Sequence, residues 1–222
     1  MQRGQAEPLV RPALSLHHWE ALLSLIIRRQ DRFSRGELIL RRLFGMIYIG
    51  IPHVTLLAIF GIWLVVARLV TFFSVLIFGN FPNGFFDFHR GYLEWYLRVA
   101  ASIGLLGGFG NLVDGYPAFF PWTKSEKVKL ILDRPAHVNR GTAILRFLFG
   151  TVYVRLPHYC CLFLRDIASM ILAFLAWWAI LVTGRYPARW HGFNVGTYRW
   201  SVRVYLYLSY LTEEYPPFSG KE

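Results

Sequence analysis

The chain has 222 residues, of which 55% are hydrophobic, 18% aromatic and only 17% charged, and its 24 Lys and Arg against 13 Asp and Glu give a net charge of +11. Soluble domains carry about 25% charged and 45–50% apolar residues, so this composition indicates a membrane protein and excludes a disordered chain. The two cysteines are adjacent, at Cys160 and Cys161, which excludes a disulfide-stapled scaffold and an all-cysteine metal site.

Short strands are predicted in each half of the chain, after a polar N-terminal segment with two prolines at residues 1–22. Val128–Leu132 (VKLIL) alternates between apolar and polar residues as a short strand does. Leu23–Ile27 occupies the equivalent place in the first half.

Two apolar blocks are long enough to cross a bilayer. The first has no charged residue from 43 to 67 and continues from 69 to 78, and the second has none from 167 to 183. Crossing takes about 20 mostly apolar residues, and about 17 suffice for a short crossing. We therefore predict apolar helices from about residues 38 and 142, capped at their ends by Gly79 and Gly184.

Each apolar block is interrupted by a proline, Pro52 or Pro157, which predicts a kink or a break. As one straight helix, residues 38–78 would be about 60 Å long, twice the hydrocarbon thickness. Each block is therefore either a kinked long helix or a hairpin of two helices. Basic residues flank both ends of both blocks, and two crossings would keep nearly all of them on the cytoplasmic side. We predict hairpins, with tips near residues 60–61 and 165–166.

A third helix is predicted in each half, at about residues 91–106 and 196–211. Its charges recur four residues apart, as at Arg199 and Arg203, and form a stripe. Its tryptophans and tyrosines suit an amphipathic helix in the headgroup region. A helix packed in a bundle, with the charged stripe facing a partner, is the alternative.

The chain is a tandem repeat with an offset of 105 residues. RRLFGMIYIGIPH at 41–53 aligns with RFLFGTVYVRLPH at 146–158. The copies end in Tyr-Pro-aromatic segments that are six residues out of step, so the first copy has an insertion in its glycine-rich stretch at 104–111. We expect the copies to pack about a pseudo-twofold axis along the membrane normal. The domains are a polar segment (1–22), membrane repeat 1 (23–120), a linker (121–127) and membrane repeat 2 (128–222).

The order of the motifs resembles a bacterial integral-membrane domain family of unknown function. These motifs are N/S-R-G, LPH, TGRYP, RW and YPPFS. The second copy matches across its length, whereas the first has Asn80-Phe81-Pro82 in place of R-Y-P. The resemblance implies a protein of the bacterial inner membrane, and it implies no activity. We expect a multi-pass, all-α integral membrane protein with cytoplasmic termini.

His53 and His158 follow proline at the same place in both copies. A symmetric pair of imidazoles could hold a haem iron or a divalent metal if the two rings faced each other. More often such a histidine bonds a backbone carbonyl that the proline has left unpaired. We favour that structural role and expect no cofactor.

Ionisable groups within apolar stretches are the other candidate sites, because burying an unpaired charge is costly. Arg165 and Asp166 are expected to form a wet hairpin tip, whereas Arg155 could reach a lipid phosphate or a partner's carboxylate. The predicted lipid or partner contacts are Arg68, Arg155, Arg185, Arg199, Arg203 and Trp200.

Catalytic signatures for phosphate cradling, a nucleophile elbow or a zinc protease are missing from the sequence. The basic residues follow the membrane boundaries, which favours anionic phospholipids over nucleic acid as partners. We therefore predict a non-catalytic accessory or scaffold subunit of a larger membrane complex, bound to other membrane-protein subunits. A small transport or lipid-handling module is the alternative. The terminal Tyr-Pro segments could dock on a neighbour or seal the domain's own base.

Overall fold

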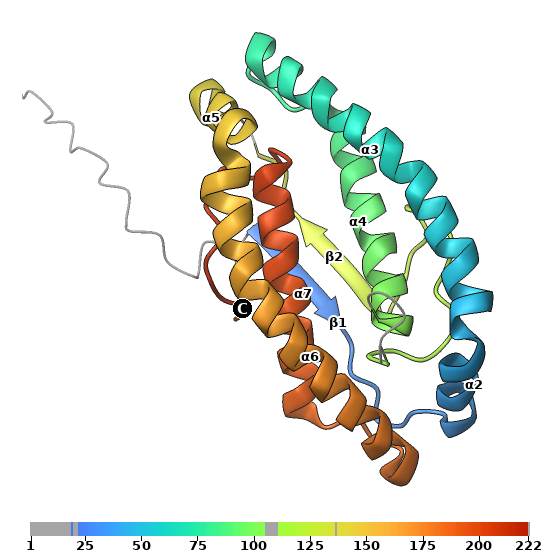
Figure 1. The fold of residues 1–222 in the computed structure, drawn as a ribbon. Helices are drawn as coiled ribbons and strands as arrows, with labels where there is room; N and C mark the ends of the chain where they lie inside the picture. The colour runs from blue at the N-terminus through green and yellow to red at the C-terminus, as the bar shows by residue number, and fades with distance from the viewer. Residues whose placement is uncertain (1–18, 20–21, 105–110, 136, 222) are drawn as a thin grey trace, which may run out of the picture.

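The computed structural model describes residues 19, 22–104, 111–135 and 137–221. Most of the polar N-terminal segment and most of the glycine-rich stretch therefore lie outside the described residues. The helices and strands are β1 (Leu23–Ile27), α2 (Arg35–Gly45), α3 (Ile51–Phe78), α4 (Asn83–Ile103), β2 (Val128–Leu132), α5 (Arg140–Gly150), α6 (Leu156–Thr183) and α7 (Ala188–Leu208). Figure 1 shows their arrangement, with each long helix running beside a shorter antiparallel one. The bounds in the second half lie 105 residues after those in the first.

The two predicted strands are confirmed, and they pair with each other antiparallel. The pairing is centred on Leu25 and Leu130, which are themselves 105 residues apart. Leucine, isoleucine and valine side chains on one face of this ribbon are buried, whereas Ile26 and Lys129 on the other face are exposed. The fold is thus mostly helical but carries a two-stranded sheet, which corrects the all-α prediction.

Each apolar block forms one continuous helix, so the hairpin prediction is wrong and the long-helix alternative holds. The helices run from Arg35 to Phe78 and from Arg140 to Thr183, without turning at residues 60–61 or 165–166. By length and composition, both could span a membrane.

A π-helical turn explains why neither proline breaks its helix. The turn covers Met46–Gly50 in the first half and Thr151–Arg155 in the second, just before the proline. Proline lacks an N–H and its ring clashes with the carbonyl four residues earlier. In the wider turn the Ile51 N–H donates to the Met46 carbonyl, five residues back, which gives the ring room without ending the helix.

The ends of the long helices are capped by side chains and by glycine. The Ser34 hydroxyl accepts from the Glu37 N–H at 3.3 Å, and Asn139 caps α5 in the same way. Gly79 and Gly184 adopt φ of 74° and 71°, a left-handed conformation that glycine adopts without strain. Both predicted C-terminal caps are confirmed.

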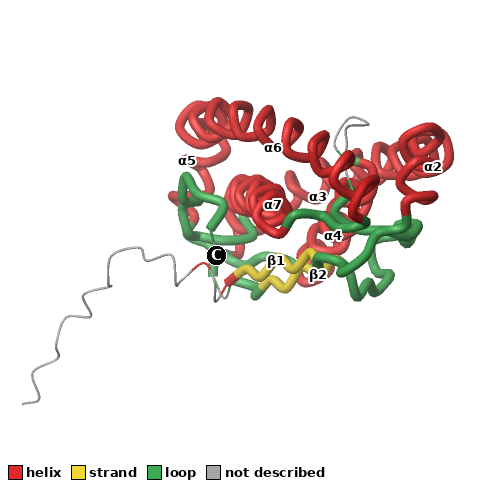
Figure 2. Tube along the Cα trace, turned by 90° about the horizontal axis from the view of Figure 1, so that it is seen from below, coloured by secondary structure: helices red, strands yellow, loops and turns green. Residues whose placement is uncertain are grey.

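The shorter helices α4 and α7 are buried in the middle of the molecule, which corrects their predicted place among lipid headgroups. They begin about eight residues earlier than predicted and pack against the long helices on one side and the ribbon on the other. Seen from below in Figure 2, α2, α5 and α6 lie above α7 and α4, and the ribbon forms the opposite side. The helices are packed in a bundle as the alternative predicted, but arginines of the charged stripe donate to carbonyls of the chain's own loops and not to a partner.

The two halves interlock at the ends of the long helices. The Phe33 N–H donates to the Gly184 carbonyl at 2.9 Å, and the Val138 N–H to the Gly79 carbonyl at 3.3 Å. Beside them, Arg35 donates to the Val182 carbonyl and Arg140 to the Ile77 carbonyl. Each long helix therefore begins where the other ends, and the two run antiparallel.

Candidate functional site

In the first half, the predicted histidine lies in a cluster of aromatic rings between α3 and α4. His53 is completely buried, and its Nδ1 accepts from the Trp95 indole N–H at 3.0 Å. Phe119 stacks on the imidazole with ring centroids 4.0 Å apart, and Tyr116 lies 5.3 Å away. The Tyr116 hydroxyl donates to the Tyr48 carbonyl at 3.1 Å.

In the second half, the equivalent cluster surrounds His158. Its Nδ1 accepts from the Trp200 indole N–H at 2.9 Å, and Phe218 stacks on it at 3.9 Å. Its Nε2 lies 3.2 Å from the Tyr215 hydroxyl, which donates to the Tyr153 carbonyl. The terminal Tyr-Pro segments therefore pack against the base of their own half. This is one of the two alternatives that the sequence left open, the other being docking on a neighbour.

This hydrogen bonding assigns the same neutral tautomer to both imidazoles. Because Nδ1 accepts an indole proton, the ring proton must lie on Nε2. A haem iron or a zinc ion needs a nitrogen with a free lone pair, and neither ring offers one in this arrangement. The arrangement fits a structural role, although the partner is a tryptophan rather than the backbone carbonyl that we expected. Among the described residues, no group of three or more His, Cys, Asp or Glu could hold a metal ion.

Two arginines inside the long helices bind carbonyls in the last turn of the shorter helices and in the loops that follow. Arg146, whose side chain is fully buried, donates to the carbonyls of Tyr207 and Thr212 and pairs with the Glu213 carboxylate at 3.1 Å. In the first half Arg41 does the same, with acceptors from Ser102, Val113 and Gly115 and an ion pair with Glu37. Sequence analysis missed both residues, although their alignment at the repeat offset was a usable signal.

Three of the predicted lipid or partner contacts are buried against the chain itself. Arg199 donates to the Gly220 carbonyl at 2.9 Å, and Arg203 to the Lys221 carbonyl at 2.8 Å. Trp200 is the partner of His158 and is 6% exposed. These side chains hold the C-terminal segment in place and present almost no surface to a lipid or another subunit.

The remaining predicted contacts lie nearer the surface. Arg68 is half-buried, with its guanidinium 5.9 Å from the Tyr210 ring centroid. Arg155 and Arg185 are exposed, and Arg185 lines a hollow at the end of α6 together with Arg32 and Arg35. Of the contacts predicted from sequence, Arg155 and Arg185 remain candidates for headgroup contacts.

Arg165 and Asp166 lie inside α6, in its N-terminal half, rather than at a hairpin tip. The Arg165 Nε donates to the Thr197 hydroxyl at 2.9 Å, and its Nη2 donates to the Phe193 carbonyl at 3.2 Å. The guanidinium also lies 4.2 Å from the Phe193 ring centroid. Arg165 therefore joins α6 to α7.

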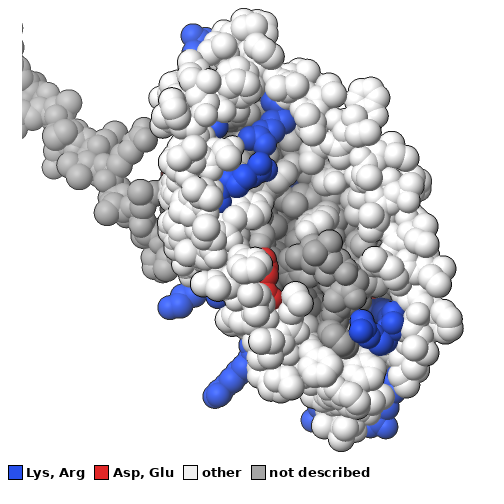
Figure 3. Space-filling model, in the orientation of Figure 1, with Lys and Arg blue, Asp and Glu red and all other residues white. Residues whose placement is uncertain are grey.

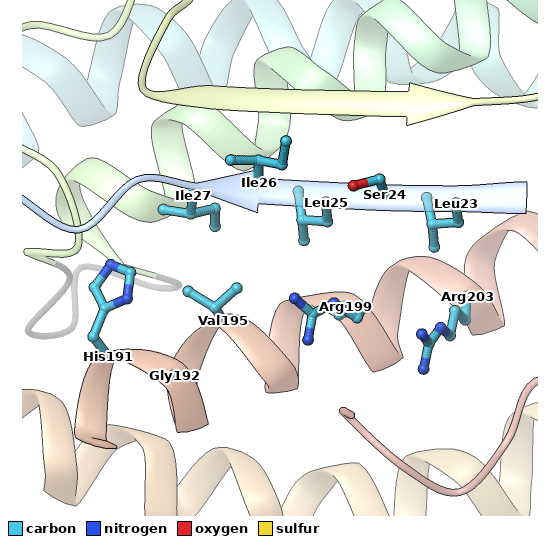
Figure 4. Close-up of a pocket in the computed structure, with 10 residues that line it drawn as sticks. All are labelled: Leu23, Ser24, Leu25, Ile26, Ile27, His191, Gly192, Val195, Arg199 and Arg203. Atoms are coloured by element: carbon cyan, nitrogen blue, oxygen red, sulfur yellow. The ribbon is translucent and has the colours of Figure 1, made fainter. Parts of the chain in front are cut away.

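A pocket of about 610 Å³ lies between β1 and α7 (Figure 4). His191, Arg199 and Arg203 line its helix side, and the strand side is largely apolar. Burial, assisted by the charge of Arg29, lowers the pKa of His191 to about 4. That imidazole is therefore neutral at physiological pH, and the positive charge of the pocket comes from the two arginines.

The two long helices form an apolar face on the surface of the molecule. In the span from 43 to 78, every exposed side chain is uncharged, and from 144 to 183 Arg155 is the one exposed charge. Figure 3 views the molecule from this side, where uncharged residues cover most of the described surface and Lys, Arg, Asp and Glu occupy small parts of it. Isolated exposed apolar residues are common on soluble proteins, but a continuous face of this size marks an interaction with a membrane or a protein.

Comparison with known proteins places a domain of unknown function, DUF4389, at residues 142–220. The matched segment covers most of α5 and all of α6 and α7, together with the C-terminal segment. It lies in the half whose motifs carry the resemblance to a family of unknown function. No curated protein and no solved structure matches the chain significantly.

Proposed function

We propose that the protein is a non-catalytic accessory or scaffold subunit of a larger complex in the bacterial inner membrane. In this proposal the basic residues and both termini lie on the cytoplasmic side, where they contact anionic headgroups. The apolar face of the two long helices is the observation that carries the proposal.

The exposure of the long helices supports a membrane environment. In the most apolar window of each, only 22% and 11% of the residues are buried inside the protein. The core helix of a soluble protein would be mostly buried. Leaving this much apolar surface in water costs about 25 cal/mol per Å², so the face requires lipid or protein to cover it.

The use of the polar side chains supports a structural role. Both histidines at the repeat offset are held in one tautomer by tryptophan, and the buried arginines bind carbonyls of the same chain. A general base or a metal ligand needs a nitrogen that can accept a proton or a metal. The groups that looked most suited to chemistry instead stabilise the fold.

We further propose that the two halves are tandem copies of one domain. The common offset of the element bounds, the equivalent histidine clusters and the ribbon centred on Leu25 and Leu130 support this. Such a pair offers two similar faces to its neighbours, which suits a scaffold.

Purification from native membranes in a mild detergent tests the proposed function. We expect the protein to migrate with other membrane proteins at a size above that of a monomer or homodimer, and mass spectrometry would identify them. A protein that runs alone after gentle extraction would contradict the subunit proposal. A turnover that persists in this isolated form would favour an enzyme or a transporter.

The pocket between β1 and α7 favours the second candidate, a small lipid-handling or transport module. Its largely apolar strand side would match the apolar chain of a lipid, while its two arginines bind carbonyls of the C-terminal segment. Phospholipid retained stoichiometrically after delipidation, and lost on widening the pocket by Val195→Ala, would favour this candidate over a scaffold.

A further inference from the structure

We propose that the protein lies within one leaflet, with its two long helices parallel to the membrane plane instead of crossing it. The inference rests on the proposed membrane function and replaces the multi-pass arrangement that the sequence suggested. In this orientation the long helices face the hydrocarbon, α4 and α7 form the middle layer, and the ribbon faces the cytoplasm.

The length of the apolar face excludes an ordinary crossing. The uncharged exposed stripe of the first long helix, from 43 to 78, is about 54 Å long at a rise of about 1.5 Å per residue. The hydrocarbon core is about 30 Å thick, so the stripe would need a tilt of about 55°, beyond the range of about 0–40° seen for crossing helices. A helix that lies in the plane has no such limit on length.

The antiparallel arrangement of the two halves is a second, independent argument for the in-plane orientation. The long helices run antiparallel, because the start of each binds the end of the other. If they crossed the membrane, the exposed arginines at the start of α2 and those at the start of α5 would lie on opposite sides. Arg35 and Arg140 would then be separated by the bilayer, against the positive-inside rule. In the plane, both lie at the same interface.

The position of the two-stranded ribbon is a third argument for the in-plane orientation. β2 packs on α4, and the charge of Lys129 on β2 acts on Glu94 of α4. At nearly the same level, the Tyr92 hydroxyl donates to the Leu57 carbonyl near the middle of the apolar stripe. A crossing orientation would therefore place an exposed lysine and the outer edges of both strands at hydrocarbon depth. Open sheet edges do not occur there, because their backbone groups would lack hydrogen bonds.

Charge at the rim identifies the lipid as anionic. Arg32, Arg35 and Arg185 line one hollow at the end of α6, and Arg134 lines another at the end of α3. These arginines lie at the margin of the apolar face, where headgroup phosphates would lie in this orientation. Each basic residue near an anionic membrane contributes about 1 kcal/mol of attraction. The occupant of the face is thus the cytoplasmic leaflet, which carries anionic lipid.

Cysteine labelling tests the orientation. Gly36 at the start of the first long helix and Gly84 just after its end are exposed, and a Cβ at either would have no atom within 4 Å. In a Cys160→Ser/Cys161→Ser background, we would label Gly36→Cys and Gly84→Cys with an impermeant maleimide in sealed vesicles of both orientations. We expect both cysteines to label from the cytoplasmic side, with Lys129→Cys as the water-exposed control. Labelling of the two from opposite sides would overturn the inference.

Measuring the depth of single side chains in the bilayer tests the orientation without depending on the efficiency of cysteine labelling. Nitroxides at Ile62, in the middle of the stripe, and at Phe78, at its end, should show the same shallow depth by oxygen and nickel accessibility. A crossing helix would instead place Ile62 at the bilayer centre and Phe78 near a surface. A chain in the soluble fraction, with Ile62 in water, would overturn the membrane proposal as well. Opposite-side labelling in membranes would overturn the orientation alone.

Discussion

Buried arginines donate hydrogen bonds to the carbonyls at the ends of the shorter helices, as water does at exposed helix ends. The last carbonyls of a helix have no partner inside it, and in this protein they lie in the middle layer, away from solvent. Arg41 and Arg146 supply donors to them from the long helices. Charge on these residues therefore indicates backbone hydrogen bonding rather than a ligand site.

Replacing Arg146 by methionine should destabilise the protein strongly. The substitution retains much of the side-chain volume but removes the charged donor that Arg146 supplies to the carbonyls of Tyr207 and Thr212 and to the Glu213 carboxylate. Because Glu213 is partly exposed, we expect a loss on the order of 3 kcal/mol, the lower end for a broken buried pair. Thermal unfolding in detergent, followed by tryptophan fluorescence, would measure it. The same change at exposed Arg189 should have almost no effect, and equal losses would contradict this role.

The roles of these side chains could not be predicted from sequence, because their partners are distant in the chain. Arg146 bonds to residues 61 and 66 positions away, and the Trp200–His158 bond spans 42 positions. Local patterns show only that a charge or a ring recurs at helical spacing. The repeat offset aligned both histidines, and also Trp95 with Trp200, but it could not show that the indole N–H fixes the imidazole tautomer.

At the scale of elements, features set by local backbone chemistry were predicted well. The alternation in Val128–Leu132 predicted a strand, and the glycines after each apolar block predicted left-handed caps. Pro52 predicted a kink or a break, and the break is absent because a π-helical turn before the proline gives its ring room. The hairpin prediction was wrong because it assigned the basic residues that flank each block to one side of a membrane, whereas Arg35 and Arg140 bind carbonyls at the end of the other long helix.

The glycine cap of α6 provides a test of one of these features. Gly184 has φ of 71°, where an added Cβ costs about 1–2 kcal/mol, so Gly184→Ala should lower stability by about that amount. Gly192, exposed within α7 and with open space around its Cα, is the matched control. Gly192→Ala should raise stability by about 0.5–1 kcal/mol, since alanine favours a helix. Thermal unfolding of both variants, compared with the wild type, would show opposite shifts, and shifts of the same sign would argue against the cap.

The whole molecule is arranged in layers along one direction, from the apolar helices through α4 and α7 to the ribbon (Figures 1 and 2). An antiparallel strand pair that is centred on equivalent residues has a twofold axis perpendicular to its sheet. That axis runs perpendicular to the layers. Both long helices therefore present their apolar sides in the same direction along the axis. The sequence predicted an axis along the membrane normal, and the in-plane orientation is the one that would place it there.

A cross-link across the ribbon tests this arrangement of the halves. Ile26 pairs directly with Lys129 on the outer face, and opposite residues of an antiparallel pair have Cα atoms about 4.5–5.5 Å apart, within the range of about 4.4–6.8 Å for a disulfide. In a chain without Cys160 and Cys161, Ile26→Cys/Lys129→Cys should therefore oxidise readily with a water-soluble oxidant. Ser24→Cys/Lys129→Cys is the control, because this diagonal pair lies about 7–8 Å apart. Mass spectrometry of tryptic peptides would quantify both products. Equal yields would indicate a different register, and no cross-link in the first variant would mean that the ribbon does not join the two halves in the membrane.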